Sequence, residues 1–236
     1  PPRPPDVNYL SLVQKMLLLT RASDARISEP LANFDGASGI TYEAIQWIAD
    51  ADTDIQRLRD GWRFMRMHAD IALASGERSV TPSSALDTIS KVIPAEDSGG
   101  QRSIGCYLES LADESRVAYL DYEHWYGNGV GRGAQTRTGR PGRCTIDQGS
   151  IMFDTTADQN YQLTFDYVRT AQRMTTVTSE SLIPTEHRMA IVWWALLHFY
   201  CLTRDKTTEF REKCRLELAR EMTRLYNKQL PPITTG

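Results

Sequence analysis

The chain has 236 residues, of which 41% are hydrophobic and 24% are charged, and its net charge is -3. This balance is typical of a globular protein with a sizeable core, so a disordered chain is excluded. The weak acidic excess argues against a protein that grips nucleic acid by neutralising phosphates, and no run of about 18 apolar residues predicts a membrane span.

The N-terminal part is predicted to form one helix followed by a loop. The opening residues 1–5, Pro-Pro-Arg-Pro-Pro, lack the apolar core of a signal peptide, so we expect the protein to be cytoplasmic when made. Residues 8–20 carry a helical repeat that Asn8 or Asp6 can cap, with apolar residues at Leu10, Val13, Met16 and Leu17. Residues 22–40 contain Pro30 and two turn-forming glycines, which predicts a loop.

A second helix is predicted to begin at Thr41, whose hydroxyl can accept a hydrogen bond from a free backbone N–H. Its apolar residues share one face: Ala44, Ile45, Ile48, Ile55, Leu58 and Trp62. After Trp62 the spacing of the apolar residues changes, so the helix is expected to end there.

The middle of the chain, from about Met67 to Glu180, is rich in Gly, Ser and Thr and is predicted to be mostly β. Residues 150–153 and 161–167 are separated by turn residues, and the second run alternates strictly between apolar and polar residues. We therefore predict a hairpin with one buried face. Residues 127–142 hold six glycines and several arginines, which predicts a long exposed loop.

Helical patterns return after Pro184. Residues 187–202 are apolar nearly all round, which predicts a central buried helix that starts at Thr185. A break at residues 203–208 precedes a last helix, whose narrow apolar stripe consists of Phe210, Cys214, Leu218, Met222 and Leu225. This helix is predicted to end at Leu230-Pro231-Pro232.

These elements predict an α+β fold in which the N- and C-terminal helices form a helical bundle and the β-rich middle is an insertion. The terminal helices are expected to pack together because each carries an apolar stripe that needs a partner. The predicted domains are a discontinuous helical core of residues 1–66 and 181–236, with an extended C-terminal tail, and a β-rich insertion of residues 67–180.

No pattern in the sequence predicts a cofactor or a metal site. Residues 129–134 spell GxGxxA, but Gln135 to Gly142 cannot start the helix that a dinucleotide-binding turn requires. The cysteines, Cys106, Cys144, Cys201 and Cys214, lack CxxC spacing and are expected to be buried thiols. Of the histidines His68, His124, His187 and His198, the last two share a helix but lie about three turns apart.

Catalysis is not predicted either, and a glycan-binding module is the main alternative function. Neither GxSxG nor HExxH occurs, and the acids Asp50, Asp54, Asp113 and Glu114 have the spacing of solvated faces. A glycan-binding tail or receptor-binding module would use the aromatic residues Tyr119, Tyr122, Trp125 and Tyr126.

The last residues form the candidate binding segment. Two prolines after a long charged helix stop the helix and hold the following residues extended, which suits docking on a partner. A disordered terminus is the alternative. The segment comprises Gln229, Leu230, Pro231, Pro232 and Ile233.

Several segments, in this order and spacing, resemble the head-to-tail adaptor proteins of tailed bacteriophages, especially of the short-tailed type. They span nearly the whole chain: residues 9–14 (YLSLVQ), 47–51 (WIADA), 54–56 (DIQ), 62–65 (WRFM), 139–141 (GRP), 154–161, 167–169 (YVR), 183–193 (IPTEHRMAIVW) and 229–233 (QLPPI).

The resemblance implies a structural, non-enzymatic virion protein at the head-tail junction. It implies a ring of twelve copies below the portal protein, which completes the head after packaging, and a lumen through which DNA passes unbound. It further implies that residues 229–233 contact the portal, and that a tail nozzle or tail tube protein binds the other end of the ring. The sequence departs from the family pattern at residues 95–102 and 127–140, which leaves any partner there open.

Overall fold

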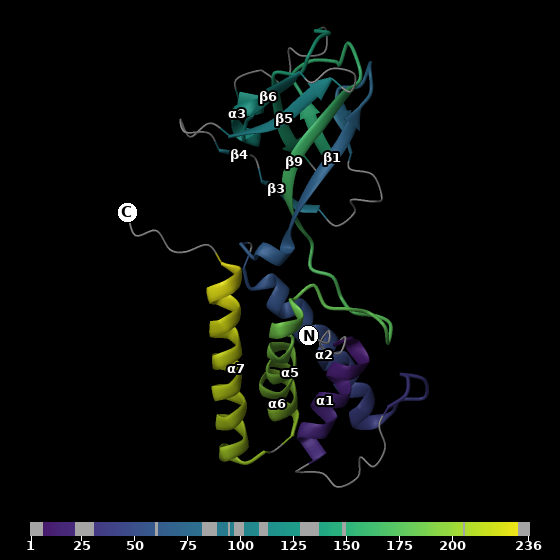
Figure 1. Ribbon diagram of the computed structural model, residues 1–236, viewed down its shortest axis with the longest axis vertical. Helices are drawn as coiled ribbons and strands as arrows, with labels where there is room; N and C mark the ends of the chain where they lie inside the picture. The colour runs from purple at the N-terminus through teal and green to yellow at the C-terminus, as the bar shows by residue number, and fades with distance from the viewer. Residues whose placement is uncertain are drawn as a thin grey trace, which may run out of the picture. The chain divides into compact units, whose positions relative to one another are not determined.

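The computed structural model describes residues 7–21, 31–59, 61–81, 89–93, 95–96, 102–108, 113–127, 137–147, 150–204 and 206–230. The chain divides into two compact units. The first, which we call the helical unit, comprises Pro1–Met65 with Ala171–Gly236. The second, the sheet unit, is Arg66–Thr170 (Figure 1).

The helical unit contains the helices from both ends of the chain. They are α1 (Tyr9–Arg21), α2 (Gly39–Arg57), the 3-10 turn η1 (Arg63–Met65), the 3-10 turn η4 (Thr185–His187), α5 (Met189–Ala195), the π-helical turn η5 (Leu196–Tyr200), α6 (Cys201–Thr203) and α7 (Thr208–Gln229). Helix α5 packs against α1 and α2 and also against α7, so it lies between them (Figure 1).

The first helix and its cap are as predicted. Asn8 accepts the backbone N–H of Ser11 at 3.0 Å with its side-chain oxygen, which satisfies one of the free donors of the first turn. The buried face of α1 consists of Tyr9, Leu12, Val13, Met16 and Leu17. The predicted loop is present over residues 31–38, whereas residues 22–30 lie outside the described residues.

Helix α2 differs from the prediction at both ends. It begins at Gly39 after Ser38, whose side chain makes no cap, so the Thr41 start is wrong. It ends at Arg57, and Leu58 is 38% exposed although it was predicted to be in the core. Trp62 is fully buried as predicted, but it lies beyond the helix, and its indole N–H donates to the carbonyl of Ile55 at 3.0 Å.

The central helix is less uniform than predicted. Ala190, Ile191 and Val192 are fully buried, but Leu202 is 76% exposed, so the apolar run leaves the core at its end. The segment also contains the π turn η5, which places one extra residue in the helical turn before Tyr200. Periodicity alone does not reveal such a turn.

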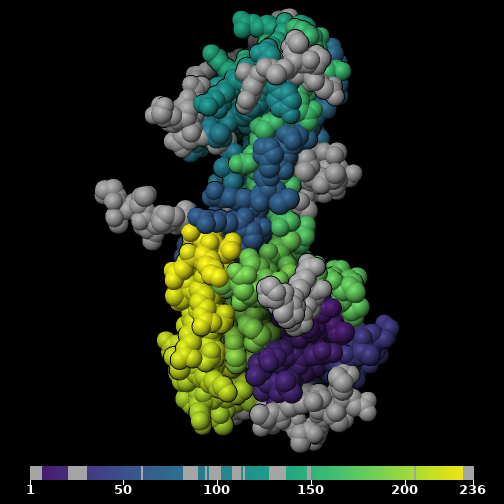
Figure 2. Space-filling view, viewed as in Figure 1, coloured from purple at the N-terminus to yellow at the C-terminus, as the bar shows by residue number. Residues whose placement is uncertain are grey.

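The last helix is confirmed. Thr207 caps α7 by accepting the N–H of Phe210, and the predicted stripe is buried at Cys214, Leu218, Met222 and Leu225. The outer side carries ion pairs three residues apart: Glu212–Arg215, Glu217–Arg220 and Glu221–Arg224. In the space-filling view, α7 forms one flank of the helical unit (Figure 2).

The sheet unit contains one nine-stranded sheet. Its strands are β1 (Arg66–Leu73), β2 (Ser79–Val80), β3 (Ile89–Ile93), β4 (Ala95–Glu96), β5 (Arg102–Leu108), β6 (Glu114–Tyr119), β7 (Arg143–Asp147), β8 (Ser150–Phe153) and β9 (Tyr161–Arg169), with the short helix α3 (Tyr122–Gly127) between β6 and β7. The order is β1-β9-β5-β6-β7-β8-β2, with β3 beside β9 and β4 beside β5. Only the β6–β7 pair is parallel among the described strand pairs.

The sheet is nearly closed because its two end strands, β1 and β2, are consecutive in the chain and joined by residues 74–78. Strand β9 alternates between buried and less buried residues up to Tyr167, as its sequence predicts. Its buried side chains join those of the other strands in a core that includes Leu73, Cys106, Phe153 and Leu163.

Two predictions about the middle of the chain are wrong. The α+β helical bundle with a β-rich insertion is replaced by a mixed α and β fold, because the middle residues form a large, nearly closed sheet with a core of its own. The hairpin of residues 150–167 is also wrong in its pairing. Strand β8 pairs with β7 and β2, while β9 pairs with β1, β3 and β5.

The glycine-rich segment is only partly the predicted exposed loop. Residues 128–136 lie outside the described residues. In residues 137–142, Pro141 is buried and Arg140 donates to the carbonyls of Cys106 and Asp113 at 2.8 and 2.6 Å. Its guanidinium also pairs with the Asp113 carboxylate at 2.6 Å, so this part is fixed to the strands.

Candidate functional site

The predicted binding segment begins at the end of α7. Gln229 is the last residue of this helix, and the N–H of Leu230 donates to the carbonyl of Tyr226 at 3.0 Å. Leu230 itself has extended backbone angles, so the chain turns out of the helix there. Pro231, Pro232 and Ile233 lie outside the described residues.

The end of α7 rests on the segment that follows α2. The ring of Tyr226 stacks on Trp62 with centroids 5.3 Å apart and an interplanar angle of 14°, and Trp62 stacks in turn on Phe64 at 5.4 Å. The Arg59 guanidinium lies 6.0 Å from the centroid of Tyr226. We call Arg59, Trp62, Phe64 and Tyr226 the tail base.

Leu230 also lies close to this segment. A Cβ placed on Gly61 would lie 3.7 Å from Leu230 Cδ2, which is ordinary van der Waals distance. The indole bond to Ile55 fixes the orientation of the fully buried Trp62, and stacking transmits that orientation to Tyr226. The first residue of the tail therefore leaves from a fixed position within the helical unit.

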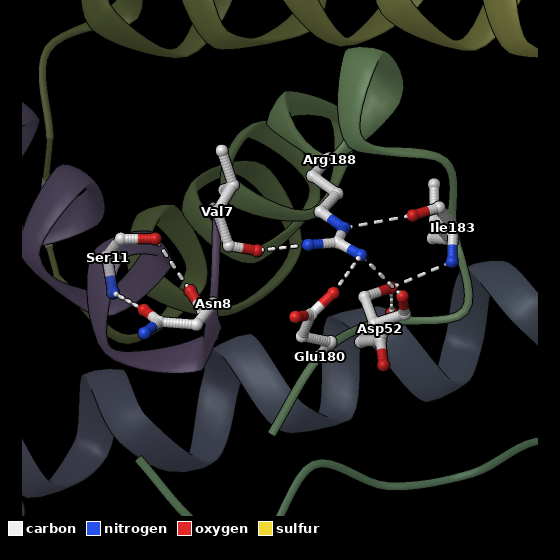
Figure 3. Close-up of polar contacts among 8 residues, drawn as sticks. Val7, Asn8, Ser11, Asp52, Glu180, Ile183 and Arg188 are labelled. Carbon is white, nitrogen blue, oxygen red and sulfur yellow. Dashed lines mark hydrogen bonds and ion pairs between the residues drawn. The ribbon is translucent and has the colours of Figure 1, made fainter. Parts of the chain in front are cut away.

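A second notable site is a buried polar network around Arg188, which the sequence analysis missed (Figure 3). Its guanidinium donates to the backbone carbonyls of Ile183 at 3.0 Å, Ser181 at 2.9 Å and Val7. It also pairs with the Glu180 carboxylate at 3.2 Å. Because Arg188 is only 6% exposed, these acceptors replace the water that its charge has lost.

Asp52 enters the same network from α2. Its carboxylate accepts the Ser181 hydroxyl at 2.5 Å and the Gln56 amide at 2.8 Å. Burial raises the pKa of Asp52 to about 6, and the two hydrogen bonds and the Arg188 charge oppose that rise. The Ser181 oxygen also accepts the N–H of Ile183 at 3.0 Å, so a single serine joins α2 to the segment before η4.

The same segment satisfies the start of α1. The N–H groups of Tyr9 and Leu10 donate to the carbonyls of Ser179 and Val177 at 2.9 and 3.4 Å. These are first-turn donors that have no partner within a helix. The network thus joins α1, α2 and the chain before α5, and its polar groups serve the fold of the helical unit.

The sequence held a signal for Asp52 but not for its partners. Asp52 lies four residues after Ile48 and three before Ile55, on the predicted apolar face of α2, where a carboxylate has to be buried. From the sequence alone, Arg188 cannot be distinguished from a solvent-exposed charged residue near the start of a helix. Its carbonyl acceptors cannot be recognised from sequence because every residue has one.

Several of the remaining titratable candidates have structural partners. His68 contacts Asp166 at 2.9 Å on the exposed sheet surface, and His198 stacks on Trp194. Asp50 pairs with Arg173 at 2.8 Å. His187 is buried, and burial lowers its pKa. In the part of the chain that the structure describes, no three such side chains are grouped as metal ligands would be.

The aromatic residues proposed for glycan binding are divided by the fold. Trp125 is fully buried in α3, and Tyr119 packs against the core of the sheet. Tyr122 is 53% exposed, and its ring centroid lies 4.6 Å from that of Tyr126, tilted by 49°. The Tyr126 hydroxyl donates to Asp147 at 3.3 Å. These rings do not form a flat platform for a sugar.

Comparison with models of known protein families gives a match. The model of the family described as SU10 adaptor protein matches residues 7–233, which is nearly the whole chain and includes the predicted binding segment. No curated protein matches the chain. Among the described helices, none combines the length and apolarity needed to cross a bilayer.

Proposed function

Because this chain belongs to the SU10 adaptor protein family, a family of phage adaptor proteins, we propose that it is a structural subunit that joins the portal of the head to the tail. The match over residues 7–233 is the observation that carries the proposal. This range covers the sheet unit and nearly all of the helical unit, so the proposed role belongs to both units. The work of such a subunit is assembly, and it requires no turnover.

The proposed assembly is a closed ring of twelve copies at the head-tail junction of a short-tailed phage. In such a ring each copy presents one surface to the next copy and a different surface to the previous one. The ring would complete the head after packaging and continue the DNA channel towards a tail nozzle or tail tube protein. A chain with a net charge of -3 has little tendency to hold passing DNA by releasing its counterions.

Residues 229–233 are the proposed portal contact. The tail base supports this role because it fixes the point from which the segment departs. An extended segment with two prolines loses less conformational entropy on binding than a flexible one. An anchored start restricts the segment further, since its first residue is already in place.

The test mixes the purified chain with the portal ring encoded in the same genome. We expect stacked rings in particle images, and a chain shortened by residues 231–236 should keep its melting temperature but bind the portal at least tenfold more weakly. Images with no portal-bound ring would remove the proposed function. Full binding by the shortened chain would instead remove the C-terminal segment from the contact.

A further inference from the structure

Three exposed arginines lie within or next to the segment that follows α2, on which the end of α7 rests. Arg57 ends α2, Arg59 follows it, and Arg63 begins η1. All three are exposed, and none forms an ion pair with the residues that the structure describes. Their positive charge is therefore not balanced by a neighbouring carboxylate among those residues.

Most of the other arginines that the structure describes in the helical unit form ion pairs. Arg173 lies 2.8 Å from Asp50, Arg204 lies 3.1 Å from Glu43, and Arg215, Arg220 and Arg224 pair with glutamates of α7. Arg57, Arg59 and Arg63 therefore differ from most described arginines of the same unit in having no ion pair with a described residue. We call them the arginine cluster (Arg57, Arg59 and Arg63).

The cluster is continuous with the exit of the tail. Arg59 lies over Tyr226, four residues before Leu230, and Leu230 lies close to Gly61, which stands between Arg59 and Arg63 in the sequence. Figure 1 shows the end of α7 beside the segment after α2. A partner that holds residues 229–233 would therefore meet the arginines along the same surface.

Building on the proposed function, we propose that the arginine cluster binds an acidic surface of the portal, next to the contact made by the C-terminal segment. Guanidinium groups pair with carboxylates through two parallel hydrogen bonds, which fixes orientation as well as charge. Duplex DNA is the less favoured ligand. Three arginines on an acidic chain release few counterions, whereas a carboxylate surface needs only a few such pairs.

The test compares two triple variants of the full chain that remove the same charge. One is Arg57→Gln, Arg59→Gln and Arg63→Gln. The control is Arg215→Gln, Arg220→Gln and Arg224→Gln, on the outer side of α7. Affinity for the portal is measured at about 50 and 300 mM NaCl, a range over which exposed charges become strongly screened. Thermal melts report whether each variant is folded.

We expect the cluster variant to bind the portal about tenfold more weakly at low salt and to lose most of its salt dependence. The control should stay within about twofold of the native chain. Replacing the three arginines with lysine should restore much of the binding, because lysine keeps the charge, and this variant separates charge from folding.

Unchanged affinity of the folded cluster variant would overturn the inference, and so would a control variant that weakens binding as strongly. A cluster variant that loses only binding to a duplex DNA probe, with portal binding intact, would assign the arginines to DNA and overturn it too. These results leave the proposed function standing. That proposal fails only if the native chain does not bind the portal.

Discussion

The guanidinium of Arg188 donates a hydrogen bond to the backbone carbonyl of Val7, 181 residues earlier in the chain. The contact holds Val7, two residues before α1, against the start of α5. It brings together two parts of the helical unit that the sheet-forming residues separate in sequence. A side-chain charge therefore supplements the apolar packing between the first and the later helices.

Replacing Arg188 with methionine should destabilise the helical unit by about 3 kcal/mol, because Glu180 and three carbonyls lose their buried donor. Urea unfolding measures the loss. Hydrogen exchange should accelerate at residues 9–12 and 181–183. Arg215→Met is the control, since Arg215 lies on the exposed side of α7, and it should change stability by less than about 0.5 kcal/mol.

Stability should depend on pH through Asp52. Its pKa of about 6 exceeds the value of about 3.9 in an unfolded chain, so the folded state binds a proton more tightly. The native chain should therefore lose stability relative to Asp52→Asn as pH rises from about 4 to about 7, by about 2 to 3 kcal/mol. Urea melts across this range measure the difference.

The matched control for this pH series is Asp54→Asn, on the same helix but only half-buried. Its urea melts are recorded over the same pH range as those of the Asp52 variant. Parallel curves for the native chain and the Asp52 variant would show that Asp52 is not the group whose pKa burial has raised.

The stacking of Tyr226 on Trp62 should contribute measurably to the free energy of unfolding. Tyr226→Ala removes the ring that lies on Trp62 and should cost about 2 kcal/mol. Tyr226→Phe should cost less than about 0.5 kcal/mol, because the hydroxyl makes no hydrogen bond to the described residues. Equal losses in the two variants, measured by urea unfolding, would mean that the hydroxyl and not the stack stabilises this end of α7.

The sheet unit depends on the inward side of β9. Leu163 is fully buried and lies opposite Cys106 on β5 and Ile71 on β1. Leu163→Ala should destabilise the protein by about 3 kcal/mol because it leaves a cavity between three strands. Thr164→Ala, at the next and more exposed position, should cost less than half as much in the same denaturation measurement.

The cysteines should react slowly in the native state. All of them are buried, and burial raises the pKa of Cys144 and of Cys214 to about 12. At pH 8 roughly one in ten thousand of these two thiols is then ionised. A thiol reagent such as DTNB should modify the unfolded chain within minutes and the native chain over hours. Rapid labelling of native protein would contradict this burial.

The helices could be predicted from local spacing, and the sheet could not. The stripe of α7 from Cys214 to Leu225 sets which side is buried, and a periodic pattern shows this directly. The pairing of β9 with β1 joins residues about ninety positions apart, and nothing in the alternation of β9 names its neighbour. The hairpin prediction failed because it paired strands by proximity in sequence.

The candidate site was predictable only in part. The end of α7 followed from Pro231 and Pro232, which cannot continue a helix. The stack of Tyr226 on Trp62 joins α7 to the end of α2, and its two rings are 164 positions apart in the sequence. Asp52 and Arg188 were missed because charged residues are usually solvated, and their burial depends on partners supplied by other parts of the chain.

The pairing of β1 with β9 also dictates an order of events during synthesis. Strand β1 is synthesised well before β9. Its backbone hydrogen bonds to β9 therefore cannot all form until residue 168 has been made. Helix α1 can pack against α2 early, but its contacts with α5 form later still. The barrel-like sheet can therefore form on the ribosome before the helical unit is complete, and the N-terminal helices lack their α5 partner until residue 195 has been made.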